Sequence, residues 1–167
     1  MMRTFAAFAA LLLVAACQAP PAEMTVDLEA NKQVVRDVYT AIDTQDYDKI
    51  RSLMADDFTL GLVGTPEVMG TEAMLERLRA SFAAFPDYTH VVDFMVAEGD
   101  WVAVKVTLRA THQGEIYGIP ASGRAVEYGG AHFIRVVDGL VHETLLMEND
   151  LSLLTQIGMQ LVPAEER

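Results

Sequence analysis

The residues best placed to do chemistry lie near the end of the chain, where an apolar stretch runs into the polar pair Asn149 and Asp150. An aspartate among apolar side chains can act as a general base, because removal from water raises the pKa of a carboxylate. The residues after Asp150, LSLLTQIG, have the spacing of a short amphipathic helix. A carboxylate at the start of a helix can accept hydrogen bonds from its first free backbone N–H groups. Asp150 is therefore either a catalytic base or a helix cap, and we favour the cap.

Three more side chains are candidates for acid–base catalysis: Glu143, His112 and His132. Alternation places each of them on the apolar face of an expected strand, where a charged or polar group needs a partner, water or a function. His90 and His142 are interpreted as surface or rim residues. The sequence has no H-x-H or H-E-x-x-H pattern and no carboxylate cluster, so no metal site is expected. It also has no phosphate-binding loop, nucleophile elbow or Cys–His pair.

These candidates must be positioned by the surrounding helices and strands. The helical spacing of apolar residues occurs in residues 30–46, 47–57 and 70–86. Strand patterns occur in residues 58–64, 88–97, 101–113, 124–137 and 140–149. Helices followed by a run of antiparallel strands predict an α+β domain. We expect the helices to cover one face of a curved antiparallel sheet.

The last hairpin can be placed in register, because Asp138–Gly139 is a strong signal for a two-residue turn. Val137 should then lie opposite Leu140, and pairing continues outward from there. Counting along both strands collects one mixed polar and apolar face: Tyr128, His132, Ile134, Glu143, Leu145, Met147 and Asn149. Several polar groups on one apolar face favour a cavity over a solid core. We expect Tyr128, Ile134, Leu145, Met147 and Asn149 to line this pocket.

The first 17 residues have the pattern of a secretory signal, and VAAC at their end resembles the lipobox of bacterial lipoproteins. Cys17 is the one cysteine of the chain and would carry the lipid. The resemblance to bacterial sorting signals implies that Gln18, rather than an aspartate, after the cysteine favours the outer membrane, facing the periplasm. Residues 18–28 are interpreted as a tether, 29–162 as the domain and 163–167 as a tail. The net charge of −12 argues against binding to nucleic acid or to anionic lipid, so the lipid anchor would be the membrane contact.

The domain resembles the SnoaL-like polyketide cyclase (ester cyclase) family. The matching pieces, in order, are Phe85-Pro86-Asp87, Glu98-Gly99-Asp100, Thr111-His112-Gln113-Gly114, Gly118-Ile119-Pro120 with Gly123-Arg124, Asp138-Gly139 and Leu153-Leu154-Thr155-Gln156-Ile157-Gly158. The resemblance implies the cone-shaped α+β barrel shared with ketosteroid isomerase and nuclear transport factor 2. It also implies a homodimer, and cofactor-free cyclisation or isomerisation of a small, apolar, carbonyl-containing molecule.

The family's base is an aspartate in a pattern like D-x-L-G-L-L-x-Q-L-G, often with a tryptophan four residues earlier. An ungapped match puts Asn149 at the aspartate and Leu145 at the tryptophan. Three alternatives follow. Asp150 could turn inward if the strand bulges, Glu143 or a histidine could have become the base, or the pocket binds a ligand without catalysis. The competing functions are therefore an enzyme, a ligand-binding protein of the cell envelope and an interaction module.

Overall fold

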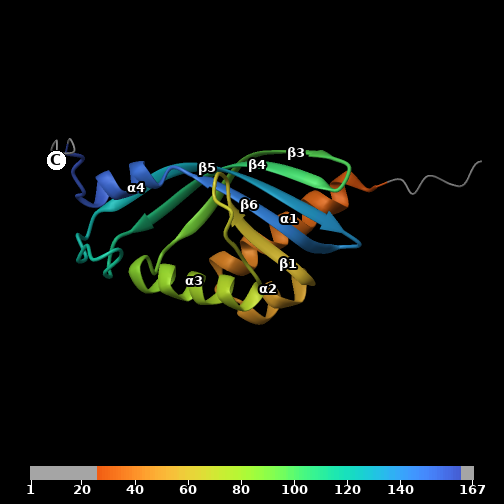
Figure 1. Cartoon of the computed structure of the whole chain (residues 1–167), viewed down its shortest axis with the longest axis horizontal. Helices are drawn as coiled ribbons and strands as arrows, with labels where there is room; N and C mark the ends of the chain where they lie inside the picture. Colours follow the sequence, from red (N-terminus) through yellow and green to blue (C-terminus); the bar gives the residue numbers. More distant parts are fainter. Residues whose placement is uncertain (1–25, 163–167) are drawn as a thin grey trace, which may run out of the picture.

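The computed structural model describes residues 26–162 (Figure 1). The predicted signal peptide, Cys17, most of the tether and the tail lie outside the described residues. The helices are α1 (Leu28–Asp43), α2 (Tyr47–Leu53), α3 (Thr71–Ala84) and α4 (Asp150–Ile157). The strands are β1 (Met54–Leu62), β2 (Val68–Met69), β3 (Thr89–Glu98), β4 (Trp101–Thr111), β5 (Ala125–Val137) and β6 (Leu140–Glu148). The α+β prediction is confirmed. Within the described residues, no helix is long and apolar enough to cross a membrane.

The first helices form because their apolar residues recur along one side and their ends are capped. The Asp27 carboxylate accepts from the backbone N–H groups of Glu29 and Ala30, which starts α1. In the same way, the Asp46 side chain accepts from Lys49 N at the start of α2. The apolar stripe expected from the helical spacing of residues 30–46 is Val34, Val35, Val38, Tyr39 and Ile42; all of it is buried except Val34, which is half-buried. In Figure 1, α1, α2 and α3 lie together across one face of the sheet.

The sheet has six strands in the order β2-β1-β6-β5-β4-β3 and is not closed into a barrel. β3 to β6 form the expected antiparallel meander, whereas β1 pairs with β6 in parallel, so the all-antiparallel prediction is wrong at this pair. Alternation in β4 is strict. Its inward residues are all buried: Val102, Val104, Val106, Leu108 and Ala110.

The turn between β5 and β6 is the predicted one, and Val137 pairs with Leu140. Asp138 and Gly139 both have positive φ angles, 50° and 78°, as a type I′ turn requires. Beyond it the register differs from the prediction. Val136 pairs with Val141, but Arg135 pairs with Glu143, so His142 is an extra residue in a β-bulge.

This bulge exchanges the two faces of the rest of β6, because side chains alternate with a period of two residues. Thr144, Leu146 and Glu148 pair with the inward-facing β5 residues and face the helices. Glu143, Leu145 and Met147 pair with Arg135, Phe133 and Ala131 on the opposite face. The inward placement predicted for Glu143, Leu145 and Met147 is therefore wrong, and the inward carboxylate of β6 is Glu148.

Candidate active site

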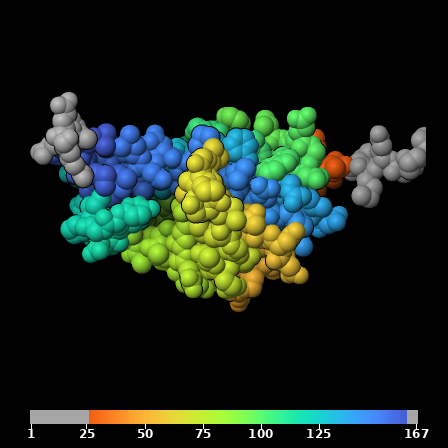
Figure 2. All heavy atoms as spheres, in the orientation of Figure 1, coloured from red at the N-terminus to blue at the C-terminus, as the bar shows by residue number. Residues whose placement is uncertain are grey.

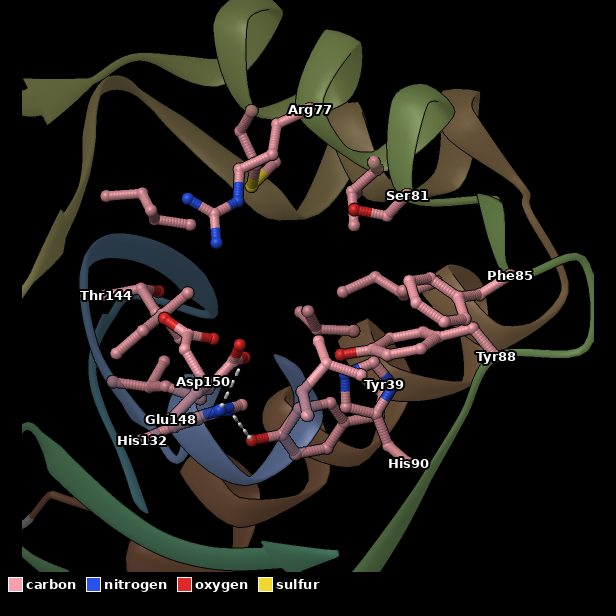
Figure 3. A pocket seen from close by; sticks show the side chains of 18 of the residues that line it. Tyr39, Arg77, Ser81, Phe85, Tyr88, His90, His132, Thr144, Glu148 and Asp150 are labelled. Atoms are coloured by element: carbon pink, nitrogen blue, oxygen red, sulfur yellow. Dashed lines mark hydrogen bonds and ion pairs between the residues drawn. The ribbon is translucent and has the colours of Figure 1, made fainter. Parts of the chain in front are cut away.

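A cavity lies between the inner face of the sheet and the helices (Figure 3). Its volume is about 120 Å³, close to that of engineered cavities that bind one benzene ring. The apolar part of its wall includes Val38, Ile42, Met54, Phe58, Leu60, Met74, Leu78, Phe85, Ile134, Val141, Leu146 and Leu153. The opening is bordered by α3, α4 and the segment between β4 and β5, which meet around a hollow in the surface (Figure 2). Exposed Tyr117, from that segment, lines the cavity at this side.

Tyr39, His132 and Glu148 form a connected polar group on the cavity wall (Figure 3). The Tyr39 hydroxyl lies 2.9 Å from Nδ1 of His132. Nε2 of the same imidazole lies 3.4 Å from Oε1 of Glu148, which is within ion-pair distance but not aligned as a hydrogen bond. Both aromatic side chains are buried, so their polar atoms depend on these contacts.

Opposing effects act on the pKa of Glu148. Burial raises it, whereas the facing His132 and the more distant charges of Arg77 and His90 lower it, and the pKa ends below its ordinary value. Glu148 is therefore ionised at neutral pH. Because an ionised carboxylate only accepts hydrogen bonds, a neutral His132 carries its proton on Nε2, and the Tyr39 hydroxyl donates to Nδ1.

Asn149 and Asp150 have the reverse of their expected positions. The helix cap is Asn149, whose Oδ1 accepts from Ser152 N at 3.0 Å. Asp150 is the first residue of α4, and its carboxylate lines the cavity beside Glu148 (Figure 3). It has no hydrogen-bond or ion-pair partner among residues 26–162. Burial and then the negative charge of Glu148 raise the pKa of Asp150, while Arg77 opposes them.

A cation and three hydroxyl groups face these carboxylates. Arg77 projects from α3 into the cavity across from Asp150 and Glu148 (Figure 3), and it makes no ion pair with any residue in 26–162. Tyr39, Tyr88 and Tyr128 also line the wall. Burial, followed by the charge of Glu148, raises the pKa of each tyrosine hydroxyl, so all three remain protonated donors.

The other residues predicted for the pocket or for catalysis fall into two groups, those that line the cavity and those that do not. Tyr128, His132 and Ile134 line the cavity, whereas Leu145, Met147 and Asn149 do not. Glu143 lies 3.8 Å from the Arg135 guanidinium on the outer face of the sheet. His112 is fully buried outside the cavity wall, with Nδ1 accepting from Ser122 N at 3.2 Å.

Four cavity groups were missed as site residues: Tyr39, Arg77, His90 and Glu148. In the sequence, Tyr39 appears only as one of the apolar-stripe residues of its helix, the expected hairpin register turns Glu148 to the opposite face, and Arg77 carries no signal. The interpretation of His90 as a surface or rim residue is wrong, since its ring lines the cavity, and strand alternation in residues 88–97 puts it on the inner face. That alternation could have identified it. Among residues 26–162, no three His, Cys, Asp or Glu side chains gather in a way that could hold a metal ion.

Comparison with known proteins agrees with the fold. The sequence model of the SnoaL-like polyketide cyclase family matches residues 32–157. The chain is 28% identical over 128 residues to the aklanonic acid methyl ester cyclase DauD of Streptomyces sp. (strain C5), covering 75% of this chain and 80% of that protein. It is 32% identical over 94 residues to the aklanonic acid methyl ester cyclase DnrD of Streptomyces peucetius, covering 56% and 65% of the two chains.

Solved structures show the same similarity. AclR of Streptomyces galilaeus superposes with a TM-score of 0.74 at 28% identity, covering 82% of this chain and 87% of that one. IdmH of Streptomyces antibioticus superposes with a TM-score of 0.70 at 29% identity, covering 77% and 99%. With the family match spanning most of the described domain, this chain belongs to the SnoaL-like polyketide cyclase family.

Proposed function

We propose that this protein is a cofactor-independent enzyme that cyclises or isomerises a small carbonyl-containing molecule by general acid–base catalysis. Membership of the family supports a cyclase or isomerase role. The observation that carries the proposal is the Asp150 carboxylate, which lines a largely apolar cavity, has no hydrogen-bond or ion-pair partner in the described part of the chain and has a raised pKa.

Asp150 suits the role of base better than Glu148 does. A general base works best when its pKa lies near the working pH and its lone pairs are free. Glu148 faces His132, and its pKa is lowered. Asp150 has no such partner between residues 26 and 162, and the charge of Glu148 helps to raise its pKa. Glu148 therefore acts on the base through its charge, and Asp150 removes the proton next to the substrate carbonyl.

Removal of that proton leaves negative charge on the carbonyl oxygen, which needs a hydrogen-bond donor or a cation. Arg77 supplies a positive charge at the cavity wall and makes no ion pair with any carboxylate in residues 26–162. The hydroxyl groups of Tyr88 and Tyr128 are protonated donors on the same wall. The enolate formed next to Asp150 would be stabilised by these groups.

The wall also indicates the class of substrate. Its many apolar residues favour a ring or alkyl skeleton over a sugar or a nucleotide. The cyclases DauD and DnrD act on aklanonic acid methyl ester, which is the first polyketide substrate to test on this protein. Because the cavity has room for about one ring, the reacting part of this larger molecule would enter it and the rest would lie at the opening.

The test compares Asp150→Asn with Glu143→Gln, a matched change of carboxylate to amide on the outer face of the sheet. The probes are 5-nitrobenzisoxazole, which opens when a base removes its carbon-bound proton, and aklanonic acid methyl ester. We expect Asp150→Asn to lower kcat/KM by about 100-fold and Glu143→Gln to change it less than twofold. Equal rates in Asp150→Asn and wild type would exclude Asp150 as the base. Ligand binding without turnover of either probe would favour a binding protein instead.

We further propose that the protein is exported and attached to the outer membrane through Cys17, facing the periplasm. The support is the sequence of residues 1–17, with its apolar run and VAAC ending. The anchor would hold the cavity at the membrane surface.

We also propose that two copies pair through the outer face of the sheet. The exposed apolar side chains on β3 to β6 support this: Phe94, Val96, Trp101, Phe133 and Met147. Contiguous apolar surface of this kind commonly marks a protein interface. Light scattering should give a dimer for the wild type and a monomer for Phe94→Lys. A monomeric wild type would contradict the pairing.

A further inference from the structure

His90 is held against the cavity by Asp43, the last residue of α1. Nδ1 of His90 lies 2.6 Å from Oδ1 of Asp43. The backbone N–H of His90 also donates to both carboxylate oxygens, at 3.2 and 3.1 Å. The imidazole is stacked on Tyr39, with ring centroids 4.8 Å apart, and meets Tyr88 edge to face at 5.0 Å. These contacts restrict the position of the ring.

The contact with Asp43 also determines which nitrogen is available. A carboxylate accepts, so Nδ1 of His90 carries a proton and donates it to Asp43. Nε2 has no hydrogen-bond partner among residues 26–162, and the ring lines the cavity. In the neutral form Nε2 is therefore an acceptor, and in the charged form it is a donor, in both cases open to a ligand.

The same ring lies between the cavity and the solvent. His90 and Tyr39 also line an open groove between α1 and β3, together with Asp43, Lys32 and Arg36. The Asp43 side chain is 24% exposed, whereas that of His90 is 5% exposed. Protons can therefore reach the imidazole from the groove side while Nε2 serves the cavity side. The titratable and charged groups around the ring are Lys32, Arg36, Tyr39, Asp43, Tyr88, His132 and Glu148.

We propose that Asp43 and His90 form a second acid–base group of this cavity, in which Nε2 of His90 exchanges a proton with the substrate oxygen. This rests on the proposed function, since Asp150 is the partner base. In a cyclisation, Asp150 takes the carbon-bound proton, and the resulting enolate carbon bonds to a second carbonyl carbon. The oxygen of that carbonyl becomes an alkoxide and takes the Nε2 proton of the charged His90 imidazolium, which becomes the neutral ring with its proton on Nδ1. Asp150 then loses its proton and His90 regains one from solvent through the groove.

The proposal is tested with His90→Gln and Asp43→Asn. The matched control is His142→Gln, because His142 also pairs with an aspartate, Asp57, at 2.8 Å, but lies outside the cavity. Nitrogen NMR of the purified wild type should show the neutral His90 ring with its proton on Nδ1, and Asp43→Asn should give a mixture of the two tautomers. In the pH–rate profile for aklanonic acid methyl ester, whose cyclisation forms an alkoxide, His90→Gln should remove the limb set by His90 and lower kcat/KM by about 100-fold.

A wild-type His90 with its neutral proton on Nε2 would overturn the proposal, as would a His90→Gln profile that matches His142→Gln. The NMR measurement needs no turnover, and Asp43→Asn keeps the imidazole if His90→Gln fails to fold. Failure of the proposed function has a different signature: Asp150→Asn would keep the wild-type rate whatever His90→Gln does.

Discussion

The contact between Tyr39 and His132 gives the sharpest stability prediction. Tyr39→Phe removes one hydroxyl group and leaves the ring in place. In the wild type this hydroxyl lies 2.9 Å from Nδ1 of His132, and the two residues are only 6% and 3% exposed. The substitution therefore leaves a buried acceptor without a partner, a change that costs about 1–3 kcal/mol.

Two features of the site narrow this range. The cavity adjoins both side chains, so a water molecule can partly replace the hydroxyl, which argues against the upper end. Without the Tyr39 hydroxyl, the neutral His132 ring can move its proton from Nε2 to Nδ1, but it then presents no donor to Glu148. This shift therefore does not recover the lost stability, which argues against the lower end of the range. We expect a loss of about 2 kcal/mol in the free energy of unfolding.

The assay is urea denaturation of wild type, Tyr39→Phe and the control Tyr47→Phe. The Tyr47 hydroxyl makes no hydrogen bond within residues 26–162, so the control should stay within about 0.5 kcal/mol of wild type. The reasoning predicts unchanged m-values, because the same surface is exposed on unfolding. If Tyr39→Phe is as stable as Tyr47→Phe, the connected polar group does not stabilise the fold and the argument is refuted.

Three further predictions concern a glycine, the proposed base and the lipid anchor. Gly114→Ala should destabilise by about 1–3 kcal/mol in thermal melts, because a Cβ would overlap the Ala83 carbonyl at the end of α3; Gly129→Ala, where a Cβ meets only ordinary contacts, is the control. Asp150→Asn should be at least as stable as wild type at pH 7. The raised pKa means that the ionised carboxylate destabilises the folded state, and this difference should close as the pH falls toward about 3.9; a variant less stable at pH 7 would contradict it. Cys17→Ser should abolish labelling by a clickable palmitate analogue in a bacterial host, whereas persistent labelling would exclude lipid attachment at this residue.

Much of the fold could be predicted from local patterns. The apolar stripe of α1 and the alternation of β4 need only the geometry of one helix and one strand, and both have the expected sides buried. The Asp138–Gly139 turn is also local, since both residues adopt the positive φ angles that such a turn requires. The region of the candidate base was predictable for the same reason, because a strand end followed by a capped helix is a local signal.

The identity of the groups in the cavity was decided by tertiary structure. One extra residue, His142, turns Glu148 toward the cavity and Glu143 away from it. The motif around residues 149–158 did not show that Asn149 would cap α4 and leave Asp150 free to face the cavity. His90 joins the site because Asp43, 47 residues earlier in the chain, holds its ring.

The sequence by itself thus determined the α+β class, the positions of its main elements and the segment that carries the candidate base. Only the tertiary structure decided which carboxylates face the cavity and which histidine joins them. The physical reason is that strand side chains alternate every residue, so a single bulge reverses the faces of all residues beyond it. Whether a bulge forms depends on how β6 packs between β1 and β5, and these contacts join distant parts of the chain.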